Sequence, residues 1–404
     1  MTSRPSTALA ALTDRLVAQD ILPGVSCAVL RGTEVIDHHC SGWADREQQR
    51  PMRVDTIVRA YSSTKLITSC AALLLHDRGH FALDDPIQRW IPAFAHPQVL
   101  RPGARTLDDV EPARGDITIR HLLSHQAGLT HGVFAPGALL HEAYVARGVR
   151  RPDTTLAELM DTLAGLPLLF HPGQGWEYSA ATDVLARLCE VVSGQRFGDF
   201  LQQHLLGPLG MVDTGFVLRP EQRPRFAALY GAAHPADPLG PGLQRLDDVP
   251  YPGAWQEPRP RQSGAGGLFT TLPDTLALLR ALLASLQAGG DGLLKPATAA
   301  EMMRNQLPAA QCVQFPAEGP AAHIARQPQL GFGLAGAVTL APSAWGGPDA
   351  VGELQWGGLA GTHWWIAPRA GLAGAFMTQR LMAFWHPAWF EFKRLAHELY
   401  AANG

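Results

Sequence analysis

The sequence predicts an α+β fold, in which a sheet domain built from both ends of the chain is interrupted by a mostly helical insertion. β-branched runs lie within residues 24–45 and again after residue 330, whereas the middle of the chain has the three- and four-residue apolar spacing of amphipathic helices. At 404 residues the chain exceeds the usual size of one core, so one large or two interleaved domains are expected. We place the sheet domain at 1–75 and 262–404, and the helical domain at 76–261.

The first elements follow from local patterns. Helical spacing over 7–20 stops before Pro23-Gly24, and the two β-branched runs within 24–45 are joined by Arg31-Gly32-Thr33, which is typical of a hairpin. A helix is expected over 62–77, with Gly79 placed to end it. Apolar residues cover most of its circumference, so this helix is predicted to be buried.

The later elements are predicted in the same way from periodicity and turn residues. Helices are expected at 117–129, 153–166, 181–194, 197–211, 272–286 and 389–401, β-like runs at 331–338, 354–366 and 372–379, and a Pro/Gly-laden surface loop at 234–261.

Charge and composition restrict the partners. The formal net charge of -3 and a pI near 6.6 argue against nucleic acid or an anionic membrane surface as the main partner. No uncharged apolar run reaches the roughly 18 residues that a membrane span requires. Asp14 and Arg15 interrupt the region where a signal peptide would need an apolar core. Five scattered cysteines without a C-x-x-C pair favour free thiols in a reducing compartment. We therefore expect a cytoplasmic protein.

One serine and one lysine stand out at the start of the buried helix. The chain has only three lysines, Lys65, Lys295 and Lys393, and uses arginine elsewhere. Arginine cannot give up its proton in a protein, whereas a buried lysine can. Ser62 precedes Lys65 by three residues, so both side chains lie on one helical face within reach of each other.

This spacing suits nucleophilic catalysis. Burial of an amine among apolar residues disfavours its charged form, which lets it take the proton of a neighbouring hydroxyl. Unpaired backbone N–H groups in the first helical turn add a field that favours negative charge. The alternative is an N-capping serine followed by a solvated lysine, which fits poorly in so apolar a helix.

Two further segments are candidates for the rest of the site. Tyr178 lies between a Pro-Gly turn and a helix, where it either relays protons or packs its ring against that helix. Trp356-Gly357-Gly358 lies at a predicted strand, and glycine in a strand often marks the close approach of a ligand or backbone. A second copy at Trp345-Gly346-Gly347 runs into Pro348-Asp349 and is interpreted as a turn.

Rival sites find less support. No G-x-S-x-G elbow occurs, which disfavours an ordinary α/β-hydrolase. His121 and His125 have the four-residue spacing of a zinc site, but no Glu follows His121 as H-E-x-x-H demands. We interpret both histidines as structural and expect neither a metal nor another cofactor.

Together these motifs resemble the serine β-lactamase and penicillin-binding-protein superfamily, and most nearly the family VIII carboxylesterases. The resemblance covers nearly the whole chain and includes the segments at 117–129, 171–185, 205–216, 264–271, 330–334 and 356–368. In those esterases W-G-G takes the place of the K-T-G of β-lactamases, as Trp356 does here. Tyr178-Ser179-Ala180 also lacks the Asn of the Y-x-N motif.

The resemblance implies a class C β-lactamase-like fold, with an antiparallel sheet flanked by helices and the active site in the cleft beside the helical domain. It makes Ser62 the nucleophile, Lys65 the general base and Tyr178 the proton relay. The N–H groups of Ser62 and Leu359 would form the oxyanion hole, with Trp356, Gly357, Gly358 and His131 lining the site.

The implied function is hydrolysis of short- to medium-chain carboxylic esters, small molecules without anionic groups, because Trp356 offers an apolar face where relatives carry a lysine. An acyltransferase or a promiscuous β-lactamase would use the same acyl-serine. A non-catalytic ligand binder or sensor is the alternative outside the enzymes, and it would be expected to have lost the base or the relay.

Overall fold

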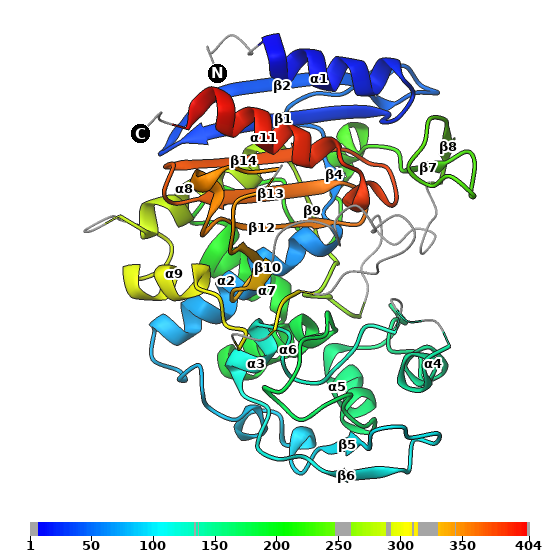
Figure 1. Ribbon diagram of the computed structural model, residues 1–404, viewed down its shortest axis with the longest axis vertical. Coiled ribbons are helices and arrows are strands. Elements are labelled where there is room, and N and C mark those ends of the chain that lie inside the picture. Colours follow the sequence, from blue (N-terminus) through cyan, green and yellow to red (C-terminus); the bar gives the residue numbers. More distant parts are fainter. Residues whose placement is uncertain are drawn as a thin grey trace.

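An antiparallel sheet forms the upper half of the molecule in Figure 1, and helices form most of the lower half. The computed structural model describes residues 7–401 except 133, 134, 136, 247–259, 288–291, 309, 310, 314–329 and 344. The predicted loop at 234–261 therefore lies partly outside the described residues. Within them the sheet has eight strands in the order β10-β11-β12-β13-β14-β1-β2-β3. The strands are β1 Gly24–Arg31, β2 Glu34–Asp45, β3 Arg50–Pro51, β10 Leu330–Phe332, β11 Ala337–Thr339, β12 Leu354–Gly358, β13 Thr362–Ala367 and β14 Leu372–Met377.

The two ends of the chain meet in the middle of this sheet. β1 pairs with β14 from Ser26↔Met377 to Arg31↔Leu372, and every neighbouring pair of strands in the sheet is antiparallel. Both termini consequently lie at the same side of the molecule (Figure 1). The predicted α+β class, with a sheet built from the first and last parts of the chain, is confirmed.

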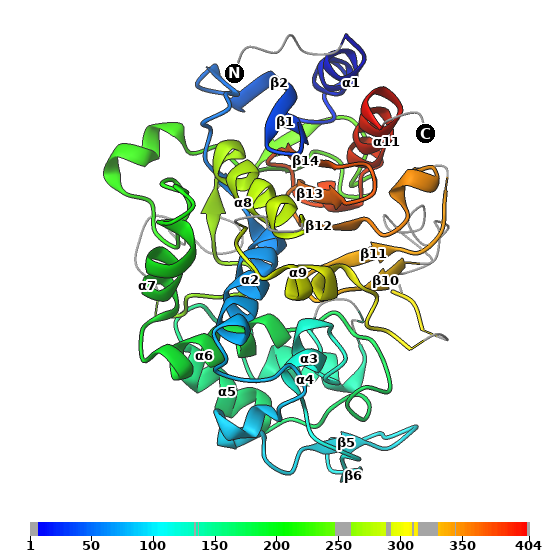
Figure 2. The same cartoon turned by 90° about the vertical axis from the view of Figure 1, so that its left-hand side faces the viewer.

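Helices cover both faces of the sheet. The terminal helices α1 (Thr7–Ala18) and α11 (Ala388–Tyr400) lie on one face, and α8 (Leu272–Ser285) lies on the other (Figure 2). An ion pair between Arg15 and Glu391, 3.0 Å long, joins α1 to α11. Strands β12, β13 and β14 are buried on both faces, which explains their nearly continuous apolar sequences.

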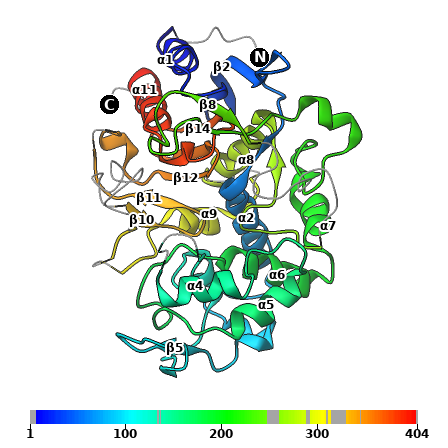
Figure 3. The same cartoon turned by 90° about the vertical axis from the view of Figure 1, so that its right-hand side faces the viewer.

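The central helix α2 (Thr64–Asp77) extends from the sheet toward the helical half of the molecule (Figure 3). Eleven of its residues are buried, as its apolar circumference predicts. The remaining α-helices among the described residues are α3 Ile119–Leu123, α4 Leu139–Ala146, α5 Leu156–Ala164, α6 Ala181–Ser193, α7 Phe197–Leu201 and α9 Pro296–Met303. Short strands also form two-stranded sheets: β4 Val58–Arg59 pairs with β9 Phe269–Thr270, β5 Gln98–Leu100 with β6 Val110–Pro112, and β7 Tyr230–Ala232 with β8 Leu243–Arg245.

Some predicted elements differ in detail. The run at 331–338 forms a hairpin of β10 and β11, because Gly333 N donates to Gly336 O (2.8 Å) and turns the chain. The helix expected over 117–129 ends at Leu123, two residues before His125 adopts a left-handed φ of +59°. The helix expected over 197–211 changes from α7 to a single π-turn at Gln202–Leu206.

Two further properties concern the helices and the cysteines. None of the helices in the described part of the chain has the length and apolar character that a membrane crossing needs. The five cysteines are free thiols, and Cys27, Cys70 and Cys189 are buried.

Candidate active site

Ser62 lies in a 3₁₀ turn, Tyr61–Ser63, that leads directly into α2. The sequence placed this serine in the first helical turn, and the structure places it immediately before. Tyr61 has a left-handed φ of +46°, which is uncommon for a bulky residue. Strain of this kind persists only where the surroundings hold it, and it is concentrated at functional sites. The backbone is therefore held in a special conformation next to the candidate nucleophile.

Lys65 is buried beside this turn, with 3% of its surface exposed. Its Nζ lies 3.4 Å from Ser62 Oγ and 4.6 Å from the centroid of the Tyr178 ring. It also donates to Ala265 O at 2.7 Å. Among the described residues no carboxylate forms an ion pair with this amine. The structure thus brings all three predicted catalytic side chains together, around one nitrogen.

The loop that carries Ala265 is fixed between α2 and α6. Asp183, in the first turn of α6, accepts hydrogen bonds from Ser263 Oγ (2.8 Å) and Ala265 N (3.1 Å). From α2, Thr68 Oγ1 donates to Gly264 O (2.8 Å). A Cβ at Gly264 would lie 2.7 Å from Thr182 O, so the loop fits only without a side chain there. Sequence reasoning used this segment for the resemblance but missed its contact with Lys65.

Trp356 holds the oxygen of Tyr178. Its Nε1 donates to Tyr178 OH at 3.2 Å, and the two ring centroids are 5.1 Å apart. The sequence predicted an apolar face for Trp356, and the structure adds an N–H donor that points to the candidate proton relay. A neutral indole N–H therefore contacts the tyrosine oxygen.

His131 lies on the other side of the tyrosine. Its ring stacks on that of Tyr178 at 5.6 Å between centroids. Burial and the positive charge of Lys65 lower the pKa of His131 to about 3, so this ring is neutral near pH 7. The structure thus places His131 against Tyr178, in the position where the sequence expected a lining residue.

The two glycines of the W-G-G motif face opposite sides of the sheet. A Cβ at Gly358 would lie 2.2 Å from Ala60 O and 3.0 Å from Tyr61 Cβ, so this glycine lets the end of β12 approach the turn before Ser62. Leu359 follows directly and is 37% exposed. A Cβ at Gly357 would instead meet His363 Nδ1 at 2.2 Å. Gly357 therefore makes room for a histidine on the α11 side and does not face Ser62.

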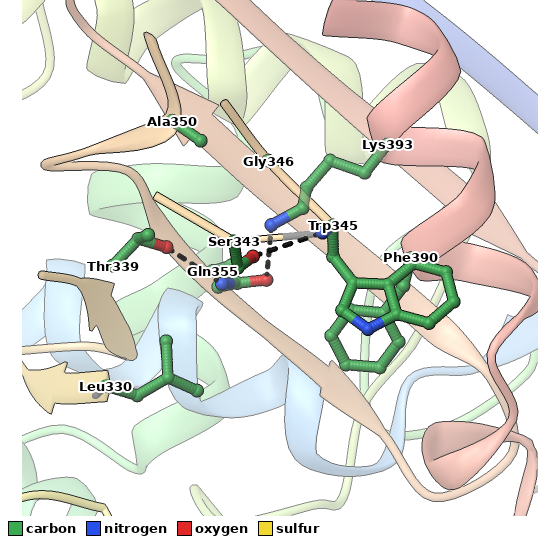
Figure 4. A pocket seen from close by; sticks show the side chains of 9 residues that line it. All are labelled: Leu330, Thr339, Ser343, Trp345, Gly346, Ala350, Gln355, Phe390 and Lys393. Atoms are coloured by element: carbon green, nitrogen blue, oxygen red, sulfur yellow. Dashed lines mark hydrogen bonds between the residues drawn. The ribbon is translucent and has the colours of Figure 1, made fainter. Parts of the chain in front are cut away.

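The second W-G-G copy lies elsewhere, as its turn-like sequence predicts. Trp345 sits in a tight turn closed by Ser343 and Gly346, and its ring packs on Phe390 of α11 at 5.7 Å. Figure 4 shows the small cavity beside it, lined by Lys393 and Gln355. The amine of Lys393 is already bound to Glu353 (2.5 Å) and Gln355 (3.0 Å). This cavity lies on the face of the sheet opposite to Trp356, so it is separate from the candidate site.

An antiparallel sheet with helices on both faces, and a serine and a buried lysine where its central helix begins, defines a serine hydrolase of the penicillin-recognising type. Comparison with known families agrees, since the β-lactamase family matches residues 9–390. The chain belongs to this family, and the predicted fold and enzyme class are confirmed.

Individual members of the family and solved structures show which enzymes the chain is similar to. Esterase EstB from Burkholderia gladioli is 35% identical over 383 residues, covering 92% of this chain and 89% of EstB. The structure of EstCE1, described as a hydrolase with promiscuous acyltransferase activity, superposes with a TM-score of 0.77 at 26% identity and 96% coverage of both chains. Unliganded simvastatin synthase LovD from Aspergillus terreus gives 0.80 at 25% identity, with both chains covered fully. These likenesses confirm the resemblance to family VIII esterases.

Proposed function

We propose that this protein hydrolyses short- to medium-chain carboxylic esters through an acyl-enzyme at Ser62. The observation that carries the proposal is the buried Lys65 amine, which contacts Ser62 Oγ and the ring of Tyr178. Such a set can deprotonate a hydroxyl and pass the proton onward within one site. The ester-cleaving relative EstB supports the same reaction class.

In the first half of the reaction, Ser62 Oγ attacks the ester carbonyl carbon while its proton moves to Lys65 Nζ. The carbonyl oxygen becomes an oxyanion, which accepts hydrogen bonds from the N–H groups of Ser62 and Leu359. When the tetrahedral intermediate collapses, the bond from carbon to the alcohol oxygen breaks. Tyr178 relays the proton from Lys65 to that oxygen, so a neutral alcohol leaves and the acyl group remains on Ser62.

In the second half, water replaces the alcohol. Lys65 and Tyr178 take a proton from the water as its oxygen attacks the acyl carbon, and the bond to Ser62 Oγ breaks as the proton returns to the serine. The hydrogen bond from Trp356 Nε1 holds the Tyr178 oxygen in place throughout. Because this donor carries no charge, we propose that the site favours neutral acyl groups over carboxylate-bearing β-lactams.

The decisive experiment combines turnover with labelling. The wild-type protein is expected to hydrolyse an aryl acetate, and a serine-directed phosphonate is expected to add its mass to the peptide that contains Ser62. S62A should lose at least about 1000-fold in rate and take up no phosphonate there. S63A removes the neighbouring hydroxyl, which donates to Thr362 O, and serves as the control for labelling. Absence of turnover, or labelling of another peptide, would reject the proposal.

Acyl transfer is the second candidate function. It is supported by the structural likeness to EstCE1 and LovD, whose descriptions name acyltransferase activity and a synthase. Transfer differs only in the group that attacks the acyl-serine. Assays with an added acceptor alcohol would reveal it as a new ester product, and a chromogenic cephalosporin would test for residual β-lactamase activity.

The domain boundaries, the partner and the location are also part of this proposal. We assign 1–75 with 262–404 to the sheet domain and 76–261 to the helical domain, with the substrate entering between them. The partner of the site is a small-molecule ester, and we propose a cytoplasmic location, consistent with the free thiols.

A further inference from the structure

The segment that carries Tyr178 has no regular secondary structure. Residues 175–179 connect a turn at Pro172-Gly173 to α6, and neither a helix nor a strand ladder includes them. The orientation of the Tyr178 phenol therefore depends on contacts that other parts of the chain make with its neighbours.

Those contacts come from the residues that follow α3. Glu177 N donates to His125 O at 3.0 Å, and Ala180 N donates to Thr130 O at 3.1 Å. Thr130 Oγ1 also donates to the carboxyl group of Glu177 at 2.8 Å. The segment is thus anchored on both sides of Tyr178 to one short stretch of backbone.

The side chain of His125 adds a direct anchor. Its Nδ1 accepts from Ser179 N at 3.2 Å and lies 2.9 Å from Ser179 Oγ. Because its carbonyl oxygen holds Glu177, His125 contacts both residues that flank Tyr178. Its ring also packs on the Tyr178 ring, with 4.9 Å between centroids. Only 3% of His125 is exposed, so water does not replace these contacts easily.

The protonation of His125 suits this role. Burial and the positive charge of Lys65 hold its pKa well below the ordinary value, so the ring stays neutral near pH 7. Since Nδ1 accepts a backbone hydrogen bond, the ring proton lies on Nε2. His121, four residues earlier, makes a different contact: its Nδ1 accepts from Thr118 N at the start of α3. The two histidines with zinc-like spacing therefore bind different parts of the backbone: His121 caps the start of α3, and His125 holds the segment of Tyr178.

We propose that His125 is a positioning residue, which fixes Tyr178 for proton transfer by holding the peptide groups on both sides of it. This inference rests on the proposed function, in which Tyr178 relays the proton between Lys65 and the alcohol oxygen. A displacement of about 1 Å in a catalytic group can cost about 100-fold in rate. His125 would therefore affect the reaction without touching the substrate.

Two substitutions at His125 separate the effect of its ring from the effect of its hydrogen-bond acceptor. H125F keeps a ring but loses the acceptor, and we expect kcat on an aryl acetate to fall about 100-fold with KM changed by less than about 3-fold. H125N retains an oxygen acceptor near Nδ1 and tolerates the left-handed backbone, so kcat should stay within about 5-fold of wild type. His96 has the same φ of +59° but is exposed, so H96F is the matched control for backbone strain.

A double-mutant cycle with Y178F tests whether His125 acts through the tyrosine. The double variant H125F/Y178F should be no slower than Y178F alone, because no phenol remains to be positioned. The proposal is overturned if H125F lowers the rate of Y178F by a further 100-fold or so, if H125N is as slow as H125F, or if folded H125F keeps wild-type kcat. If H125F does not fold, as judged by circular dichroism, H125G takes its place, because glycine adopts this backbone conformation without strain.

A separate readout distinguishes this inference from the proposed function. If the wild-type protein hydrolyses no ester, the proposed function fails, and the same variants are compared by their rates of phosphonate addition to Ser62. Positioning by His125 would still be supported if the labelling rate is highest for wild type, lower for H125N, and lowest and equal for H125F and Y178F. Equal labelling rates for all four would reject it.

Discussion

The three lysines of this chain occupy three different environments. Lys65 is buried and contacts a hydroxyl, a carbonyl and an aromatic ring. Lys393 is buried in an ion pair with Glu353, and Lys295 is exposed and binds the carbonyl of Asp77. Of the three, only Lys65 combines burial with a candidate nucleophile, so we expect the identity of the side chain to matter most at this position.

Replacement of Lys65 by arginine tests this difference. K65R should fold, because much of the apolar stem is kept, but should lose at least about 100-fold in kcat, because a guanidinium does not accept the proton of Ser62. K295R is the matched control at an exposed lysine and should retain full activity. Hydrolysis of an aryl acetate is the measurement, and near-wild-type turnover by K65R would show that another group is the base.

For individual residues, the sequence predicted contacts between residues close together in the chain but not contacts between residues far apart in it. Ser62 and Lys65 are three residues apart, so helical geometry alone brings them together. Trp356 and Tyr178 are far apart in the chain, and only the folded sheet reveals the bond between Nε1 and OH. Asp183 was missed, and His125 was interpreted only as structural, because each acts partly through a backbone group, Ala265 N or Ser179 N, that leaves no mark in the sequence.

Among the elements, the end of strand β12 is the one that the site depends on most closely. Gly358 faces the turn before Ser62, and a Cβ there would meet Ala60 O at 2.2 Å and Thr362 Oγ1 at 2.3 Å. Backbone atoms cannot rotate away as the end of a flexible side chain does, so any added atom must separate the strand from the turn.

We expect G358A to lose about 100-fold in kcat, with a loss of stability of about 1–3 kcal/mol. The second W-G-G copy offers a matched control, since Gly347 has nothing within 4 Å of an added Cβ. G347A should therefore match wild type in both respects. Steady-state kinetics and urea denaturation of the two variants check the prediction, and equal activities would mean that β12 does not set the geometry at Ser62.

Long, strongly periodic elements were the predictable ones. Periodicity gave α2, α6 and α8 close to their observed bounds, and the Arg31-Gly32-Thr33 turn gave the β1–β2 hairpin. The hairpin of β10 and β11 was predicted as one run, because the strands have only three residues each and the turn between them is apolar at Leu334 and Ala335. The helices α4 and α9 were not expected, since eight residues give too few turns for a clear period.

Over the whole molecule, buried neutral histidines make stability depend on pH. Burial lowers the pKa of His363 to about 3 and holds that of His125 well below its ordinary value. In the unfolded chain both histidines titrate at about 6.5. Below that pH the unfolded chain binds protons that the folded protein does not, so stability is full above about pH 6.5 and is lost as the pH falls.

Each such histidine should contribute a slope of about 1.4 kcal/mol per pH unit below about pH 6. Urea denaturation between about pH 8 and about pH 5 measures the slope. H363F keeps the stacking on Trp389 (4.2 Å) and removes one titrating group, so its slope should be smaller. H80Q, at an exposed histidine, should leave the slope unchanged. A flat profile in the wild type would contradict the prediction.

The architecture as a whole was predictable from the distribution of patterns. β-branched runs at both ends, with helical periods between them, predict a sheet closed by the two termini, and the pairing of β1 with β14 confirms it. The order of the strands was not predictable from the residues alone, because pairing partners more than 300 positions apart are chosen by packing and not by local propensity.

The adjacency of β1 and β14 also has a consequence for synthesis on the ribosome. When residues 1–371 have been translated, the nascent chain already contains Ser62 and Lys65, and β1 can pair with β2 but still lacks β14 on its other side. Its open edge is then available to other chains or to a chaperone, and the turn at Tyr61 lacks the completed sheet that supports it. Activity is therefore expected only after β14 has left the exit tunnel.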